Sequence, residues 1–109
     1  MDFSQFVQAV VDIPDWYADI HFRSQHTYFY YRKQLLADFV GRYETLAEDW
    51  RTVNERCAIG EMPHLNASPR EDWKAAFDRE LAAKAMQRYR RDIDLFGYAE
   101  ELEDFVARL

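Results

Sequence analysis

The stretch Leu36–Trp50, LADFVGRYETLAEDW, constrains the fold most, because its pattern changes from that of a strand to that of a helix. Its first half surrounds Gly41 with β-prone residues, namely Ala37, Phe39, Val40 and Tyr43. We expect a buried strand here, with a bulge or a close backbone approach at the glycine. Such a strand needs neighbours on both sides, and the chain offers few candidates for them. The stretch therefore predicts the downstream part of an α/β fold.

A capped helix is predicted directly after this strand. Thr45 and Glu48 have the spacing of a capping box, in which each side chain bonds the backbone amide of the other residue. One helical face then collects apolar residues at three- and four-residue spacing: Leu46, Trp50, Val53 and Cys57. We expect this helix to reach about Ala58, with Gly60 as its C′ residue. Cys57, the single cysteine, is expected to be buried as a small hydrophobic side chain.

The whole chain, residues 1–109, is expected to form one domain. We predict a helix-dominated α+β fold with one β-hairpin near Thr27–Tyr43 and four or five helices. The other expected helices are one from Asp2 to the Asp12-Ile13-Pro14 stop, a short one capped by Ser68, the longest one from Asp78 to Gly97, and a last one over residues 99–109. Residues 15–25 show no clean period and are expected to form a loop.

Composition and spacing exclude several classes of function. The formal charge of −6 argues against nucleic acid as a partner. No apolar run approaches membrane-spanning length and the N-terminus does not resemble a signal peptide, so we expect no membrane and a cytoplasmic location. The positions of His21, His26 and His64 match no metal signature, and no serine or cysteine has a nucleophile motif around it. The three glycines are too scattered to form a phosphate-binding loop.

The segment that begins at Ile20 carries the clearest candidate for a ligand site. His21, Arg23 and Gln25 occupy alternate positions, so in an extended chain their side chains would project from the same side. No acidic residue occurs in residues 20–37, which contain Arg23, Arg32 and Lys33. In an acidic protein this local excess of cations could attract an anionic ligand. The alternative is a solvated basic loop without a ligand.

A series of short motifs, in order along residues 3–98, resembles the C-terminal part of a sulfotransferase family, the Golgi-type carbohydrate sulfotransferases and their bacterial relatives. The motifs are Phe3–Val10, His21-Phe22-Arg23-Ser24-Gln25-His26, Asp38-Phe39-Val40-Gly41-Arg42-Tyr43-Glu44 with Leu46 and Asp49, Leu65-Asn66-x-Ser68, and Tyr89-x-x-Asp92-x-x-Leu95-Phe96-Gly97-Tyr98. The resemblance implies the C-terminal portion of the α/β, P-loop-like sulfotransferase fold.

The resemblance also implies a reaction. Such enzymes move a sulfuryl group from 3′-phosphoadenosine 5′-phosphosulfate (PAPS) to a hydroxyl or amine, usually on a sugar. By analogy, His21, Arg23 and Gln25 would border the acceptor cleft and bind an anionic sugar. Ser68 and Arg70 would belong to a late loop that closes over the nucleotide. In the family the loop that binds the 5′-phosphosulfate lies upstream of the His-x-Arg-x-Gln segment, so we expect this chain to be a truncated product, a split subunit or a fragment.

Two functions follow from different classes. The chain is either the acceptor-side piece of a sulfotransferase, inactive by itself, or a non-catalytic binding or assembly module derived from that family. Open apolar faces would favour a homo-oligomer or a partner that supplies the missing N-terminal half. The motif residues also have a structural explanation, in which Arg23 pairs with Asp19 and Gln25 bonds the backbone at the entry of the hairpin.

Overall fold

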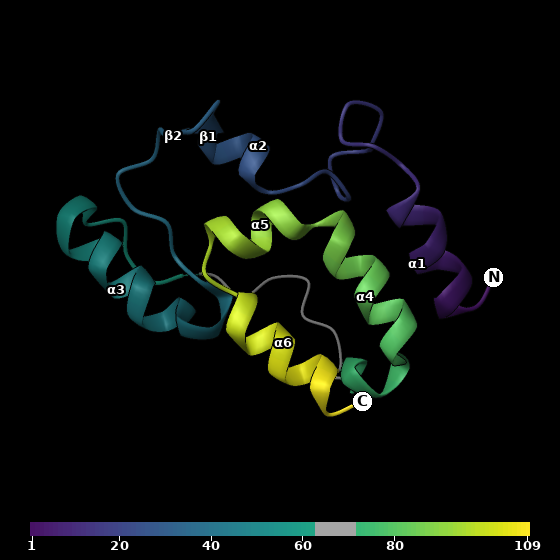
Figure 1. Cartoon of the computed structure of the whole chain (residues 1–109). Coiled ribbons are helices and arrows are strands. Elements are labelled where there is room, and N and C mark those ends of the chain that lie inside the picture. The colour runs from purple at the N-terminus through teal and green to yellow at the C-terminus, as the bar shows by residue number, and fades with distance from the viewer. Residues whose placement is uncertain (63–71) are drawn as a thin grey trace.

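The computed structural model describes residues 1–62 and 72–109, and within them the chain is dominated by helices (Figure 1). The elements are α1 (Phe3–Val11), α2 (His26–Phe29), β1 (Tyr30–Tyr31), β2 (Gln34–Leu35), the 3-10 helix η1 (Tyr43–Thr45), α3 (Leu46–Cys57), the 3-10 helix η2 (Trp73–Ala76), α4 (Arg79–Arg88), α5 (Arg90–Leu95) and α6 (Ala99–Ala107). The predicted helix-dominated class with one hairpin is confirmed. Six α-helices occur in the described part of the chain, more than the four or five predicted.

The predicted ends of α1 and α4 are confirmed by their caps. The Asp2 carboxylate accepts from the Gln5 amide at 2.8 Å, and the Gln5 side chain accepts from the Asp2 amide at 3.0 Å. The Asp78 carboxylate likewise accepts from the Leu81 amide at 2.8 Å. The longest predicted helix is interrupted at Tyr89, whose φ of −108° and ψ of 23° lie outside helical geometry, and this break separates α4 from α5.

The buried strand predicted over residues 37–43 is wrong. In the described part of the chain, β1 and β2 form a two-stranded antiparallel sheet. Residues 36–42 add no strand to it. A strand is stable only when its amides meet a neighbouring ladder, and here the Arg42 amide donates instead to the Asp49 carboxylate at 2.7 Å. The same carboxylate accepts from Thr45 Oγ1 at 2.7 Å, so the expected Thr45/Glu48 capping box is wrong as well.

The end of α3 and the start of the hairpin also differ from the prediction. Ala58 caps α3 in the left-handed conformation, with φ 51°, and Gly60, with φ 104°, lies one residue beyond the C′ position expected for it. Cys57 is exposed. The hairpin is short, with Tyr30 opposite Leu35 and Tyr31 opposite Gln34. The β-prone residues 27–29 belong to α2, because the helix start is held by a distant carboxylate described below, which overrides local propensity.

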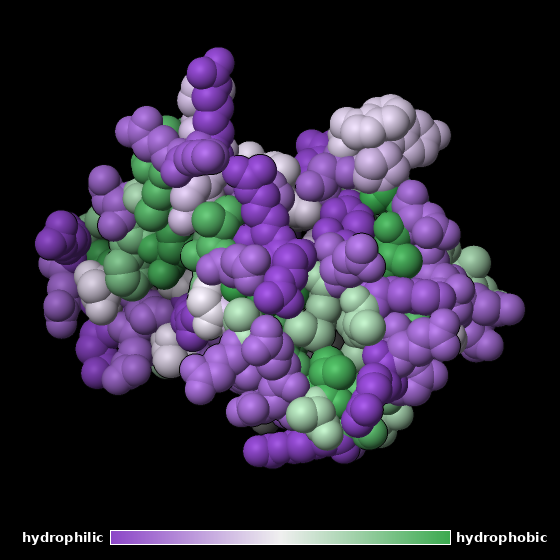
Figure 2. Space-filling model, viewed as in Figure 1, coloured by the Kyte–Doolittle hydropathy of each residue, from purple (hydrophilic) through white to green (hydrophobic). Residues whose placement is uncertain are grey.

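The core is small and lies where α1 packs beside α4 (Figure 1). The buried hydrophobic side chains are Val7, Ala18, Leu81, Ala82 and Ile93. The radius of gyration is 16.1 Å, whereas a compact domain of this length has about 13 Å. The elements are therefore spread out, with α3 lying far from α1, and much apolar side-chain surface is exposed (Figure 2). No helix in the described residues is long and apolar enough to cross a membrane.

Candidate functional site

The loop between α1 and α2 holds the three predicted substrate-binding residues, but it is not extended. The Phe22 and Arg23 amides both donate to the Asp19 carbonyl at 3.0 Å, which folds residues 19–23 into a turn. His21 is 77% exposed and its Nδ1 lies against the Asp19 carboxylate. Arg23 turns inward and donates from Nη2 to the Ala18 carbonyl at 3.0 Å. The expected one-sided row of His21, Arg23 and Gln25 is therefore not formed.

Arg88 of α4 fixes this loop to the helices. Its guanidinium donates to the Ile13 carbonyl at 3.0 Å, to Ser24 Oγ at 3.1 Å and to the Asp15 carboxylate at 2.8 Å. The Ser24 amide also donates to Asp15, at 2.9 Å, and Ser24 is only 2% exposed. Burial alone would raise the pKa of Asp15, but the Ser24 amide and the Arg88 guanidinium outweigh it and lower that pKa.

Asp92 of α5 fixes the end of the same loop. Its carboxylate accepts from the Gln25 amide at 2.6 Å and the His26 amide at 2.8 Å, and His26 Nδ1 lies 2.7 Å away. Asp92 thereby satisfies two of the free amides at the start of α2. The Tyr89 hydroxyl adds a bond to the Phe22 carbonyl at 2.7 Å, and burial raises the pKa of that hydroxyl. We call the contacts of Arg88, Tyr89 and Asp92 with residues 13–26 the loop junction.

A second junction joins the segment before α3 to the segment before α6. Arg42 Nη2 donates to the Phe96 carbonyl at 2.5 Å and to the Gly97 carbonyl at 3.2 Å, and the guanidinium carbon lies 4.4 Å from the centre of the Tyr98 ring. The Tyr98 hydroxyl donates to Glu44 at 2.8 Å, and this bond lowers the pKa of Glu44. We call these contacts the α3 junction.

Gly97 is required at the α3 junction for two reasons. Its φ is +77°, a conformation that side chains with a Cβ rarely adopt, and a Cβ there would lie 3.0 Å from Arg42 Nη2. The two junctions bring motifs that lie far apart in the sequence into contact with one another. The His21–His26 motif meets Tyr89-x-x-Asp92, and the segment with Arg42 and Glu44 meets Phe96-Gly97-Tyr98.

Sequence reasoning missed Asp15 and Arg88, which do most to hold the loop. Neither residue lies in a motif, and their separation along the chain gives no periodic signal. Asp92 belongs to a motif, but its role as a distant cap for α2 does not follow from sequence spacing. The predicted cofactor-binding residues Ser68 and Arg70, with the short helix expected from Ser68, lie outside the described residues.

Within residues 1–62 and 72–109, no cradle forms for the 5′-phosphosulfate of PAPS. Gly41, Gly60 and Gly97 lie on separate segments, so no glycine-rich loop can present several amides to one phosphate. The inward-facing guanidinium groups of Arg23 and Arg88 already donate to protein oxygens. No group of three or more His, Cys, Asp or Glu residues in the described part of the chain could hold a metal ion.

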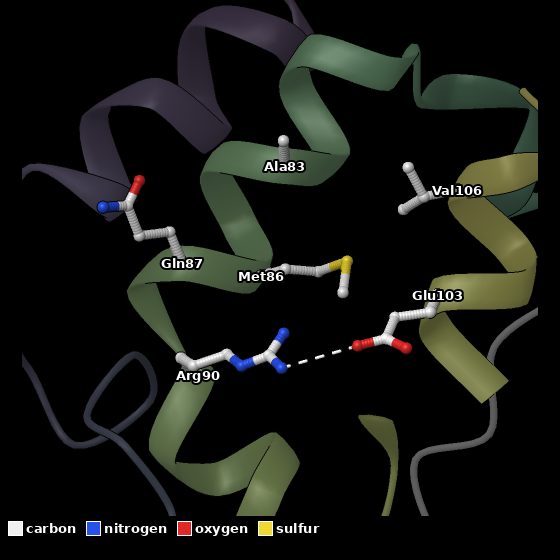
Figure 3. A pocket seen from close by; sticks show the side chains of 6 residues that line it. All are labelled: Ala83, Met86, Gln87, Arg90, Glu103 and Val106. Carbon is white, nitrogen blue, oxygen red and sulfur yellow. Dashed lines mark ion pairs between the residues drawn. The ribbon is translucent and has the colours of Figure 1, made fainter. Parts of the chain in front are cut away.

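Two surface hollows lie away from the exposed His21. One, of about 430 Å³, opens between α4 and α6 and is mostly apolar, with the Arg90–Glu103 ion pair at 3.5 Å on its edge (Figure 3). It is lined by Ala83, Met86, Gln87, Arg90, Glu103 and Val106. The other, of about 500 Å³, is more polar and lies between α1 and α4 beside Arg88. The first hollow contains no motif residue.

Comparison with protein families matches residues 1–99 to the Sulfotransferase family. No curated protein and no solved structure matches the chain. The matched range contains every described residue of both junctions, so the two clusters that hold this fold together lie within the family's shared region. Because the match spans most of its length, the chain belongs to the sulfotransferase family.

Proposed function

We propose that the chain supplies the acceptor side of a sulfotransferase that transfers a sulfuryl group from PAPS to a carbohydrate hydroxyl. The observation that carries the proposal is the loop junction. It holds a solvent-exposed imidazole, His21, on a loop that is bonded to α4 and α5 at several points. Membership of the sulfotransferase family supports the reaction class.

His21 is suited to interact with an acceptor hydroxyl. Hydrogen bonds from the His21 amide and ring lower the pKa of Asp19, so Asp19 is a carboxylate at neutral pH and acts only as an acceptor. His21 Nδ1 must then carry the proton in their contact, which leaves Nε2 free to accept one in the neutral ring. A hydroxyl bound at Nε2 could pass its proton to His21 as its oxygen becomes the nucleophile.

The sharpest test measures binding and transfer separately. We expect the purified chain to bind oligosaccharides, detected by changes in amide chemical shifts of residues 19–25. We expect no transfer of radiolabelled sulfate from PAPS, because the described residues do not form a phosphosulfate cradle. His21→Ala should weaken binding at least fivefold, whereas Arg51→Ala, an exposed change on α3, should not. If the chain binds no sugar, the proposal is wrong. Sulfate transfer by this chain alone would contradict only the expected inactivity.

A second candidate function, a non-catalytic assembly module, is favoured by an exposed apolar segment around β2. Leu35, Leu36 and Phe39 are all exposed there, and apolar side chains gather over this region on the face seen in Figure 2. Such a patch favours self-association or a protein partner. Sedimentation of the parent chain and of Leu36→Asp at micromolar concentration distinguishes the two functions. A parent dimer that becomes a monomer in the variant, without any sugar binding by the parent, would support the assembly module.

A further inference from the structure

Two large aromatic side chains stand side by side in the solvent at the tip of the loop between α1 and α2. Trp16 is 83% exposed and Tyr17 is 74% exposed, and their ring centres are 5.8 Å apart at an angle of 65°. In Figure 1 this loop rises above α4 and α1, and in the same view of Figure 2 a pale mass projects at that place. Neither ring contributes to the core, so burial does not explain why the chain places them there.

The loop that carries these rings is well fixed. The Tyr17 and Ala18 amides donate to the Pro14 carbonyl at 3.0 and 2.9 Å, and Ala18 is buried. On either side of the two rings, Asp15 is bonded to Arg88 and the Ala18 carbonyl accepts from Arg23. Two exposed rings on a loop with this many anchors lose little conformational freedom when they bind a ligand.

We propose that Trp16 and Tyr17 form a stacking platform for an uncharged pyranose ring. An aromatic face carries partial negative charge, and the C–H groups on one side of a pyranose are weak donors to such a face. The inference rests on the proposed function, because the same loop presents His21, and the platform would hold a sugar that neighbours the acceptor sugar.

The charge of the loop decides against other ligands that stack on aromatic rings. Residues 12–20 contain Asp12, Asp15 and Asp19 and no lysine or arginine. Arg88 pairs with Asp15 and Arg23 turns in beneath the loop, so these cations offset only part of the charge. A nucleotide, a sulfated sugar or a uronate at the platform would still meet the exposed carboxylates of Asp12 and Asp19. A neutral hexose or N-acetylhexosamine meets no such repulsion.

The test compares the parent chain with three double variants in binding neutral and charged oligosaccharides. The probes are chitotetraose, maltotetraose and an unsulfated chondroitin tetrasaccharide, followed by tryptophan fluorescence and by amide chemical shifts. Trp16→Ala with Tyr17→Ala removes the platform, and Trp16→Phe with Tyr17→Phe keeps two rings. Tyr31→Ala with Tyr43→Ala is the matched control, because both tyrosines are exposed and lie outside this loop.

We expect the parent to bind at least one neutral tetrasaccharide. The double alanine variant should bind it with at least tenfold lower affinity. The phenylalanine variant and the control should keep an affinity within about threefold of the parent. Equal binding by the double alanine variant would overturn the platform while leaving the proposed function standing. Binding of the charged tetrasaccharide alone would also overturn it. No binding of any sugar would overturn both.

Self-association through the rings is the remaining explanation, and sedimentation identifies it. If the parent forms a dimer that the double alanine variant does not, and chemical shifts of the loop do not respond to sugar, then Trp16 and Tyr17 form a contact between copies and the sugar platform is wrong. The substitutions are not expected to unfold the chain, since both side chains are exposed. Far-ultraviolet circular dichroism checks this.

Discussion

The loop junction and the α3 junction use the same kinds of bond in different surroundings. Each has one arginine that donates to backbone carbonyls, one tyrosine hydroxyl and at least one carboxylate that accepts from amides or hydroxyls. At the loop junction Arg88 is 10% exposed, and Asp92 is 13% exposed. At the α3 junction the contacts of Arg42 and Glu44 are open to solvent. Hydrogen bonds screened from water contribute more to stability than exposed ones, so the two junctions should differ in strength.

The difference also separates two ways of attaching an element to the fold. The loop before α2 is held next to the small core, with Ala18 and Ser24 buried beneath it. The helix α3 has no buried residue and is held to the rest mainly through Arg42 and its partners. Opening of α3 should therefore cost far less free energy than opening of the loop, and the two should exchange amide hydrogens at different rates.

The largest effect is expected for Arg88→Ala. The change leaves the Ile13 carbonyl, the Ser24 hydroxyl and the Asp15 carboxylate without their partner in a screened site. We expect a loss of about 2–4 kcal/mol in the free energy of unfolding, measured by urea denaturation. A loss below about 0.5 kcal/mol would show that solvent replaces these bonds and that the two junctions do not differ.

A smaller, pH-dependent effect is expected for Asp15→Asn. The pKa of Asp15 is lowered in the folded chain, so its stabilisation is fully present above the unfolded value of about 3.9 and is lost as pH falls through the folded value. The variant should be less stable than the parent by about 1–2 kcal/mol at pH 7, and the gap should narrow below about pH 4. Urea denaturation at pH 7, 5 and 3 measures it. A gap that stays constant with pH would mean that the charge of Asp15 does not matter.

Local rules in the sequence were enough to predict part of this fold. Helices start at Asp2 and Asp78 and one ends at Gly97, as predicted, because each of these signals depends on residues within one turn of itself. The failures came from long-range contacts. The strand predicted around Val40 had no neighbour to pair with, and the β-prone residues after His26 became helical because Asp92 caps them from far along the chain.

The candidate site shows the same limit. The motif contains His21, Arg23 and Gln25 at alternate positions. Alternate side chains share one side only if the backbone is extended, and here hydrogen bonds to the Asp19 carbonyl fold the backbone into a turn. The expected ion pair between Arg23 and Asp19 is also wrong. The Asp19 carboxylate contacts His21 instead, and Arg23 donates to the Ala18 carbonyl. Whether these residues bind a sugar stays a prediction.

The smallest effect is expected for Arg42→Ala, and its place in the molecule makes it informative. The change removes the bonds from Arg42 Nη2 to the carbonyls of Phe96 and Gly97, yet all of these groups can turn to water. We expect a global loss of at most about 1 kcal/mol. Amides of α3 should nevertheless exchange at least several-fold faster, while those of α4 keep their rates, because α3 loses its main attachment. Arg51→Ala, on α3 itself, is the control and should change neither. Equal acceleration in α3 and α4 would mean that both open together with the whole chain and that the two junctions act as one unit.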